Sequence, residues 1–203
     1  MKINLINTNV GNLNSLKNML NRIGIIVNIA NSMKDLYSEN VIILPGVGSF
    51  DAAVKNLKVS GIFDLLKDEK FLKDKYLLGI CLGMQLLLSE SKEGSERGLS
   101  LIPGVTEKFD SNFVKVPHMG WNNLIDCSLD YEFLNTKKFY FAHSFYAKCD
   151  KKFIKAYSKH SVKFPAIIQN KRIIGIQFHP EKSHQNGIQL LKKILENIKN
   201  NAI

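Results

Sequence analysis

The first half of the chain alternates short apolar runs with segments whose apolar residues recur every three or four positions. The apolar runs predict strands at residues 2–7, 25–30, 41–44 and 76–80. Leucine and isoleucine at positions 13, 16, 20 and 23 share one face of a helix over residues 12–23, and another helix is expected over 51–57. Strands that alternate with helices in this way are typical of an α/β fold with a parallel sheet covered on both faces.

The second half is built differently. Short segments rich in β-branched and aromatic residues follow one another at 138–143, 153–157, 166–169 and 173–178. They predict additional antiparallel strands and hairpins. The chain closes with an amphipathic helix that carries Ile188, Leu191, Ile194, Leu195 and Ile198. No repeat or linker interrupts the sequence, so we expect residues 1–203 to form a single domain.

A cysteine lies where a predicted strand meets a predicted helix, in the sequence GICLGMQ at residues 79–85. An apolar run leads in at 76–80, and a helical run leads out at 84–88. This is the pattern of a nucleophile elbow, with cysteine in place of serine. Flanking glycines permit a tight turn, and a helix N-terminus favours thiolate over thiol. Cys81 is therefore predicted to be a nucleophile.

A candidate base follows the apolar run at 173–178, where the sequence continues His179-Pro180-Glu181. Residues two apart on an extended segment point the same way. We therefore expect Glu181 to orient the imidazole and His179 to face the Cys81 sulfur, which is the general logic of a catalytic triad.

The composition indicates the cellular compartment in which the protein is expected. No apolar run approaches the roughly 18 residues of a membrane span, and the first residues are too strand-like for a secretory leader. Three cysteines, Cys81, Cys127 and Cys149, do not form a disulfide framework. A reduced, cytoplasmic location is expected, without membrane association. No cofactor and no metal ion is expected.

The net charge of +10 raises the question of nucleic-acid binding. The basic residues are scattered, however, and the densest stretches, 148–155 and 159–172, carry no nucleic-acid motif. We do not expect a nucleic-acid partner.

The Cys81 and His179 motifs identify a family resemblance. GICLGMQ at 79–85 and HPE at 179–181 resemble the motifs of class I glutamine amidotransferases. Four more segments resemble, within that family, the glutaminase subunits of imidazole glycerol phosphate synthase: PGVGSF at 45–50, GLSLIPG at 98–104, PHMGWN at 117–122 and YFAHSFY at 140–146. The resemblance spans essentially the whole chain. It implies a flavodoxin-like open sheet with the active site beyond the carboxyl ends of the strands.

The resemblance also implies roles for individual residues. L-Glutamine is the expected substrate, hydrolysed to glutamate and ammonia by Cys81, His179 and Glu181. The oxyanion donors are expected to be the backbone N–H of Leu82 and the Val47–Gly48 peptide, which would turn into the site only when a partner is loaded.

Further residues are expected to hold the substrate. These are Gln85, Glu93, His143, Ser144 and Phe145, with Glu93 suited to the α-ammonium group and the backbone of the last three residues to the other end of the molecule. A solvated loop carboxylate is the alternative for Glu93.

The implied partner is a cyclase subunit with a (β/α)₈ barrel. In this heterodimer it would use the ammonia to make imidazole glycerol phosphate and an aminoimidazole carboxamide ribotide (AICAR) in histidine biosynthesis. Asn12, His118, Met119 and Trp121 are expected at the interface, although a buried core position is the alternative for Trp121. Three other functions stay open: an aminosugar-forming client, a cysteine peptidase on the same fold, and a binding module without activity.

Overall fold

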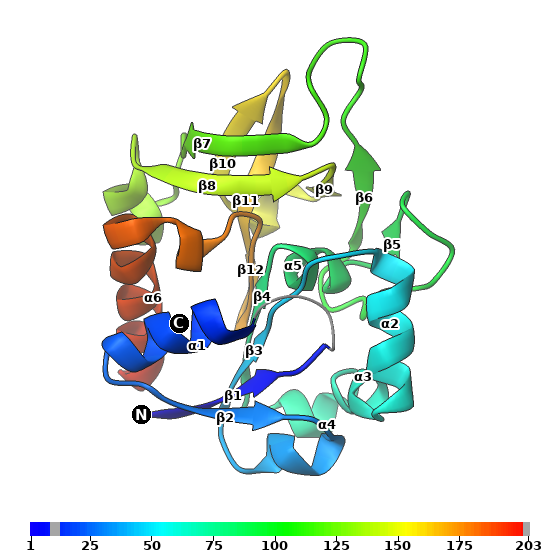
Figure 1. Cartoon of the computed structure of the whole chain (residues 1–203), viewed down its shortest axis with the longest axis vertical. Helices are drawn as coiled ribbons and strands as arrows, with labels where there is room; N and C mark the ends of the chain where they lie inside the picture. The colour runs from blue at the N-terminus through cyan, green and yellow to red at the C-terminus, as the bar shows by residue number, and fades with distance from the viewer. Residues whose placement is uncertain (9–12, 201–203) are drawn as a thin grey trace.

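The computed structural model of the chain describes residues 1–8 and 13–200 (Figure 1). A seven-stranded sheet forms its centre. From one edge to the other, its strands are β10 (Ile154–His160), β11 (Val162–Asn170), β12 (Ile173–Ile176), β4 (Tyr76–Ile80), β3 (Val41–Leu44), β1 (Lys2–Ile6) and β2 (Ile26–Ala30). The five strands from β12 to β2 are parallel, and β10 and β11 extend the sheet by antiparallel pairing.

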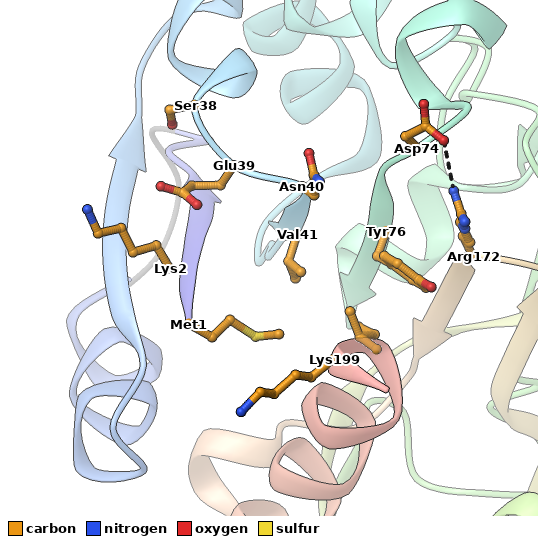
Figure 2. A pocket seen from close by; sticks show the side chains of 11 residues that line it. Met1, Lys2, Ser38, Glu39, Asn40, Val41, Asp74, Tyr76, Arg172 and Lys199 are labelled. Atoms are coloured by element: carbon orange, nitrogen blue, oxygen red, sulfur yellow. Dashed lines mark hydrogen bonds and ion pairs between the residues drawn. The ribbon is translucent and has the colours of Figure 1, made fainter. Parts of the chain in front are cut away.

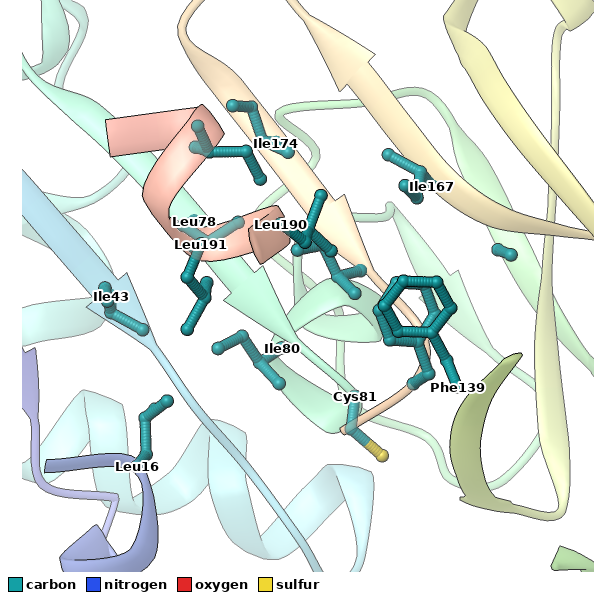
Figure 3. Packing of buried hydrophobic residues seen from close by; sticks show 14 of the residues in the cluster. Leu16, Ile43, Leu78, Ile80, Cys81, Phe139, Ile167, Ile174, Leu190 and Leu191 are labelled. Carbon is teal, nitrogen blue, oxygen red and sulfur yellow. The ribbon is translucent and has the colours of Figure 1, made fainter. Parts of the chain in front are cut away.

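Helices cover both faces of the sheet (Figure 1). One face carries α1 (Leu13–Arg22) and α6 (His184–Lys199), and the other carries α2 (Phe50–Val59), α3 (Ile62–Leu65), α4 (Glu69–Leu72) and α5 (Leu82–Leu86). Successive residues of β3 divide between the two cores: Ile43 belongs to the core that contains Leu190 of α6, whereas Ile42 belongs to the core under α2. Figure 3 shows the α6 side of this packing, with Cys81 at its margin.

Two smaller sheets complete the fold. The hairpin of β7 (His118–Asn123) and β8 (Lys138–His143) is antiparallel, and β5 (Glu90–Ser91), β6 (Gly104–Lys108) and β9 (Phe145–Cys149) form the third sheet. Short 3₁₀ helices are η1 (Met33–Tyr37), η2 (Leu129–Leu134), η3 (Lys151–Phe153) and η4 (Pro180–Lys182). A bridge between Tyr140 and His179 connects the hairpin to the segment that follows β12. The hairpin therefore lies at the carboxyl end of the central strands.

The predicted α/β fold with extra antiparallel strands is confirmed, and two of the differences in detail lie close to Cys81 and His179. The helix after Cys81 covers Leu82–Leu86 rather than 84–88. It ends early because backbone N–H groups of residues 99–102 donate hydrogen bonds to the carbonyls of Leu86, Leu87 and Leu88. The strand predicted at 173–178 ends at Ile176. It pairs antiparallel with β11 on one side and parallel with β4 on the other.

Within residues 1–8 and 13–200, no helix is both long enough and apolar enough to cross a bilayer.

Candidate active site

Cys81 occupies a sharp turn between β4 and α5. Its backbone has φ 54° and ψ −108°, a sparsely populated positive-φ conformation that costs a non-glycine residue about 1–3 kcal/mol. The neighbouring glycines allow close packing around this turn: a Cβ at Gly83 would lie 1.8 Å from the carbonyl oxygen of Leu44, and one at Gly79 would lie 2.6 Å from that of Gly83. The predicted elbow is confirmed, and its strain is concentrated at the cysteine itself.

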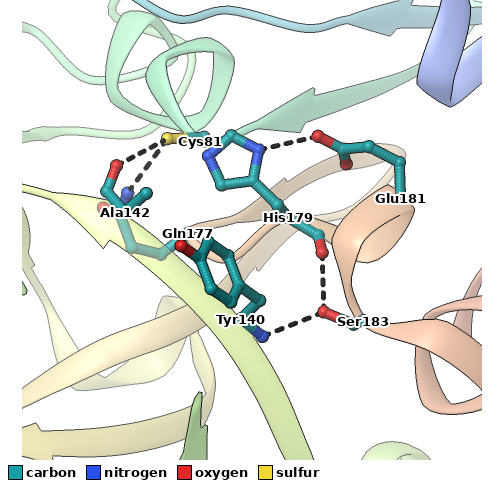
Figure 4. Close-up of polar contacts among 7 residues, drawn as sticks. All are labelled: Cys81, Tyr140, Ala142, Gln177, His179, Glu181 and Ser183. Carbon is teal, nitrogen blue, oxygen red and sulfur yellow. Dashed lines mark hydrogen bonds and ion pairs between the residues drawn. The ribbon is translucent and has the colours of Figure 1, made fainter. Parts of the chain in front are cut away.

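His179 and Glu181 form a buried pair beside this turn. The Nδ1 atom of His179 lies 2.7 Å from Oε1 of Glu181, and their side chains are only 4% and 12% exposed. Figure 4 shows the imidazole ring between Cys81 and Glu181. The expected pairing is present, but the expected extended backbone is wrong. Pro180 begins the 3₁₀ helix η4, and this turn places Glu181 next to the ring.

The backbone of His179 is fixed from two sides. Its N–H donates to the Tyr140 carbonyl at 2.9 Å. The Ser183 hydroxyl donates to the His179 carbonyl at 2.6 Å and accepts the N–H of Tyr140 at 3.0 Å (Figure 4). These bonds connect β8 and η4, so the imidazole is held on a rigid support.

Opposing influences act on the protonation of His179. Burial lowers its pKa, but the negative charge of Cys81 and the carboxylate of Glu181 outweigh burial and raise the pKa to about 10. The surroundings therefore favour the imidazolium form of His179 beside the Cys81 sulfur.

A cavity of about 210 Å³ opens beside Cys81 at the carboxyl ends of β3 and β4. It is lined by Val47, Gly48, Cys81, Leu82, Gln85, Glu93, Pro117, Met119, Ala142, His143, Ser144 and Phe145. The residues predicted to bind substrate and to form the oxyanion site therefore meet around one small space.

A larger cavity of about 620 Å³ lies at the opposite end of the parallel strands, near Met1, Val41 and Tyr76 (Figure 2). Among residues 1–8 and 13–200, those that form its walls include no cysteine or histidine, and Arg172 there is paired with Asp74 at 3.4 Å. Ligands of open α/β sheets bind at the carboxyl ends of the strands. The smaller cavity is therefore the candidate active site.

Two backbone features bear on the predicted oxyanion site. The N–H of Leu82 donates to the carbonyl of Gly46 at 3.4 Å, so it is engaged by the loop expected to supply the second donor. Gly48 has φ 97°, a value that other residues rarely adopt. The loop thus contacts the Leu82 donor directly.

Two polar side chains at the cavity have defined partners. Gln85 is buried, and its Nε2 donates to the Phe145 carbonyl at 2.9 Å. Glu93 lies at the rim and accepts the N–H of Phe50, at the start of α2, at 3.2 Å. Partial burial raises the pKa of Glu93, and the Phe50 bond opposes this in part.

His143 and His118 form a second buried pair beneath the cavity wall. His143 Nδ1 lies 2.8 Å from the Phe145 carbonyl, which can only accept, so Nδ1 carries the proton. His143 Nε2 then accepts from His118 Nδ1 at 3.1 Å. Burial lowers the pKa of His143 to about 3 and that of His118 to about 4. Both rings are therefore neutral near pH 7.

The predicted interface residues separate in the structure. Met119 and Trp121 are 64% and 46% exposed, so Trp121 is not a core residue. His118 is only 5% exposed, and the prediction that its side chain faces a partner is wrong. The reason is strand alternation, which turns His118 to the opposite face of β7. Asn12 lies outside the described residues.

The neutral histidine pair gives a testable pH dependence of stability. Unfolded histidine has a pKa near 6.5, so at these two positions the unfolded chain binds more protons than the folded chain as the pH falls below that value. We expect the free energy of unfolding to fall by roughly 3 kcal/mol between pH 7 and pH 5 from this pair. Denaturant titrations at several pH values will measure it. His118→Gln should flatten the dependence, whereas His184→Asn, at an exposed histidine, should not. An unchanged slope in His118→Gln would contradict this assignment.

Sequence reasoning missed Gln177. It is fully buried, and its Nε2 lies 3.9 Å from the Cys81 sulfur. The available signal was a polar residue within an apolar run, two positions before His179. Within residues 1–8 and 13–200, no group of three or more His, Cys, Asp or Glu side chains is arranged to hold a metal ion.

Comparison with known proteins agrees with this geometry. A family model for "Glutamine amidotransferase class-I" matches residues 4–198. "Imidazole glycerol phosphate synthase subunit HisH 1" of Campylobacter jejuni (serotype O:23/36, strain 81-176) is 46% identical over 195 residues, which cover 94% of this chain and 97% of that protein. "Imidazole glycerol phosphate synthase subunit HisH" of Carboxydothermus hydrogenoformans is 43% identical over 92% of this chain and 95% of its own length.

Solved structures share the fold at lower identity. A "Crystal structure of glutamine amidotransferase" has a TM-score of 0.77 with 19% identity, and it covers 97% of this chain and 98% of its own. "Structure of PurLQS from Thermotoga maritima" has a TM-score of 0.70 with 18% identity and the same coverage.

Proposed function

This chain belongs to the class I glutamine amidotransferase family, and we propose that it hydrolyses L-glutamine as the glutaminase subunit of imidazole glycerol phosphate synthase. The observation that carries the proposal is the strained Cys81 turn, which faces a small cavity with the buried His179–Glu181 pair behind it. The match to synthase subunits over nearly their full length supports the assignment to this synthase.

The first half of the reaction forms a thioester. The Cys81 thiolate attacks the side-chain amide carbon of glutamine, and the electron pair of the C=O bond moves onto oxygen. As this intermediate collapses, the imidazolium of His179 protonates the departing nitrogen, and ammonia leaves. Proton transfer of this kind contributes typically about 10²–10⁴ in rate.

The second half releases glutamate. The now neutral His179 takes a proton from water, whose oxygen attacks the thioester carbonyl and expels the Cys81 sulfur. Glu181, at 2.7 Å from Nδ1, keeps the ring in position and stabilises its cationic form in both halves.

The oxyanion is stabilised by the N–H of Leu82 and by the Val47–Gly48 peptide. The 3.4 Å bond from Leu82 to the Gly46 carbonyl has to open for this donor to serve. One movement of the loop that contains Gly46, Val47 and Gly48 both releases the Leu82 N–H and turns the N–H of the Val47–Gly48 peptide into the site. The loaded partner drives this movement, which prevents wasteful hydrolysis when the subunit is alone.

Substrate binding uses the rest of the cavity wall. The Glu93 carboxylate at the rim receives the α-ammonium group, while the backbone of residues 143–145 supports the other end of glutamine. Gln85 lies beneath this segment and holds it through the Phe145 carbonyl.

The exposed side chains of Met119 and Trp121 provide the partner surface. Met119 also lines the cavity, so a partner docked there closes the site and receives ammonia directly. The proposed partner is the (β/α)₈-barrel cyclase subunit, which makes imidazole glycerol phosphate and AICAR in histidine biosynthesis.

Glutamate release by the purified chain, alone and with the cyclase subunit of the same organism and its nucleotide ligand, tests this function. We expect stimulation of at least about 10²-fold, because one oxyanion donor contributes about 10²–10³. Equal turnover by the lone chain would contradict the loop switch. No stimulation by a cyclase that is active with free ammonia would overturn the histidine-pathway client and favour an aminosugar-forming one.

A further inference from the structure

Gln177 contacts the reacting sulfur but has no part in the mechanism above. It lies directly after β12 and is fully buried, with Nε2 at 3.9 Å from Sγ of Cys81. Figure 4 shows its side chain directed toward Cys81, from the opposite side to Glu181. The sulfur also lies 3.9 Å from the carbonyl oxygen of Ala142, and the orientation of the Gln177 amide decides whether Gln177 presents an N–H donor or a second carbonyl oxygen to it.

Neighbouring hydrogen bonds fix this orientation. The Phe145 carbonyl can only accept, so the Gln85 atom 2.9 Å from it is the donor Nε2. The same Nε2 lies 3.4 Å from Gln177, which must present its oxygen there. The remaining end of the Gln177 amide is its NH₂ group, and this end faces Cys81.

The Phe145 carbonyl, from which these hydrogen bonds run through Gln85 to Gln177, is itself held in place. The Phe145 carbonyl also accepts from Nδ1 of neutral His143 at 2.8 Å, which holds the peptide in place. The backbone N–H of Gln177 donates to the Ala166 carbonyl at 2.9 Å. Reversal of the Gln177 amide would set its NH₂ group against that of Gln85 and its oxygen against the sulfur. Both contacts would be unfavourable in a buried site.

We propose that Gln177 is a further catalytic residue of the glutaminase, whose side-chain N–H donates to the Cys81 thiolate and holds the sulfur toward the cavity. This inference rests on the proposed function. A donor to a charged sulfur favours the thiolate over the thiol. It therefore adds to the effect of His179, whose positive charge lies on another side of the same atom.

Other titratable groups also lie near the Cys81 sulfur. His179, with Glu181 behind it, follows β12, and His143 ends β8. Glu93 lies at the cavity rim, on the segment after β5. None of them contacts the Gln177 amide through a hydrogen bond in the described part of the chain.

The test compares Gln177→Glu, which keeps an acceptor for Gln85 but replaces the donor with a carboxylate oxygen, and Gln177→Met, which has neither group. The rate of iodoacetamide alkylation of the Cys81 peptide is measured by mass spectrometry against pH. In Gln177→Glu we expect the midpoint pH to rise by roughly one unit, as a like charge within a few ångströms produces. A smaller rise in the same direction is expected in Gln177→Met. Gln189→Glu, which adds the same charge at an exposed site on α6, should leave the midpoint unchanged.

Thermal unfolding shows which of the two Gln177 variants are folded, and one folded variant is enough for the alkylation test. A midpoint equal to that of the wild type would overturn the proposal. Alkylation needs neither glutamine turnover nor a partner, so the result is independent of the proposed function. A chain that releases no glutamate with any partner would refute the function but not this hydrogen bond. In an active complex, Gln177→Met should lower kcat by about tenfold with little change in KM, because the residue contacts the nucleophile rather than the substrate.

Discussion

Replacement of Cys81 by alanine is expected to reduce glutamate release by the assembled synthase by at least about four orders of magnitude, as removal of a catalytic nucleophile does. No other thiol can substitute. Burial raises the pKa of Cys127 and of Cys149 to about 11, so both are protonated near pH 7. Steady-state assays of the variant with the cyclase subunit and its ligand will measure the loss.

The matched controls are Cys127→Ala and Cys149→Ala. Both should keep wild-type turnover, since neither residue lies at the cavity. Residual activity of Cys81→Ala above about one hundredth of the wild type would be incompatible with a covalent route through this residue.

The second large effect is expected at His179. His179→Asn keeps a polar side chain of similar reach but cannot transfer a proton, and it should lower kcat by about three orders of magnitude or more. Glu181→Gln should cause a smaller loss, because the amide oxygen can still accept from Nδ1 while the stabilising charge is gone.

Rapid-quench measurement of ammonia release separates the two halves of the reaction in these variants. Both halves use His179, so acylation and deacylation should slow together in His179→Asn. Turnover of His179→Asn above one tenth of the wild-type value would mean that another group supplies the proton.

Local patterns in the sequence were sufficient for the elbow. The glycines around Cys81, the apolar run before it and the helical run after it are adjacent in the chain, and the turn formed as predicted. The pairing of His179 with Glu181 was predicted for the wrong reason. Pro180 at the first position of η4 is the signal that the backbone turns there.

Strand alternation should have excluded His118 from the surface that carries Met119 and Trp121. Adjacent residues of a strand face opposite sides, so His118 and Met119 could not both reach a partner from β7. The hydrogen bonds among Gln85, Phe145 and Gln177 could not be predicted in the same way. They join α5, β9 and the segment after β12, and only the folded chain brings these together.

Covalent labelling with a diazoketone analogue of L-glutamine tests the central claim most directly. The analogue keeps the amino-acid group and places an electrophilic carbon where the side-chain amide of glutamine would lie. Peptide mass spectrometry of the wild-type chain will show which of the three cysteines is modified. We predict modification of Cys81 alone, slowed by excess glutamine and absent in Cys81→Ala. Modification of Cys127 or Cys149 instead, or labelling of Cys81 that glutamine does not slow, would contradict the assignment of this cavity as a glutaminase site.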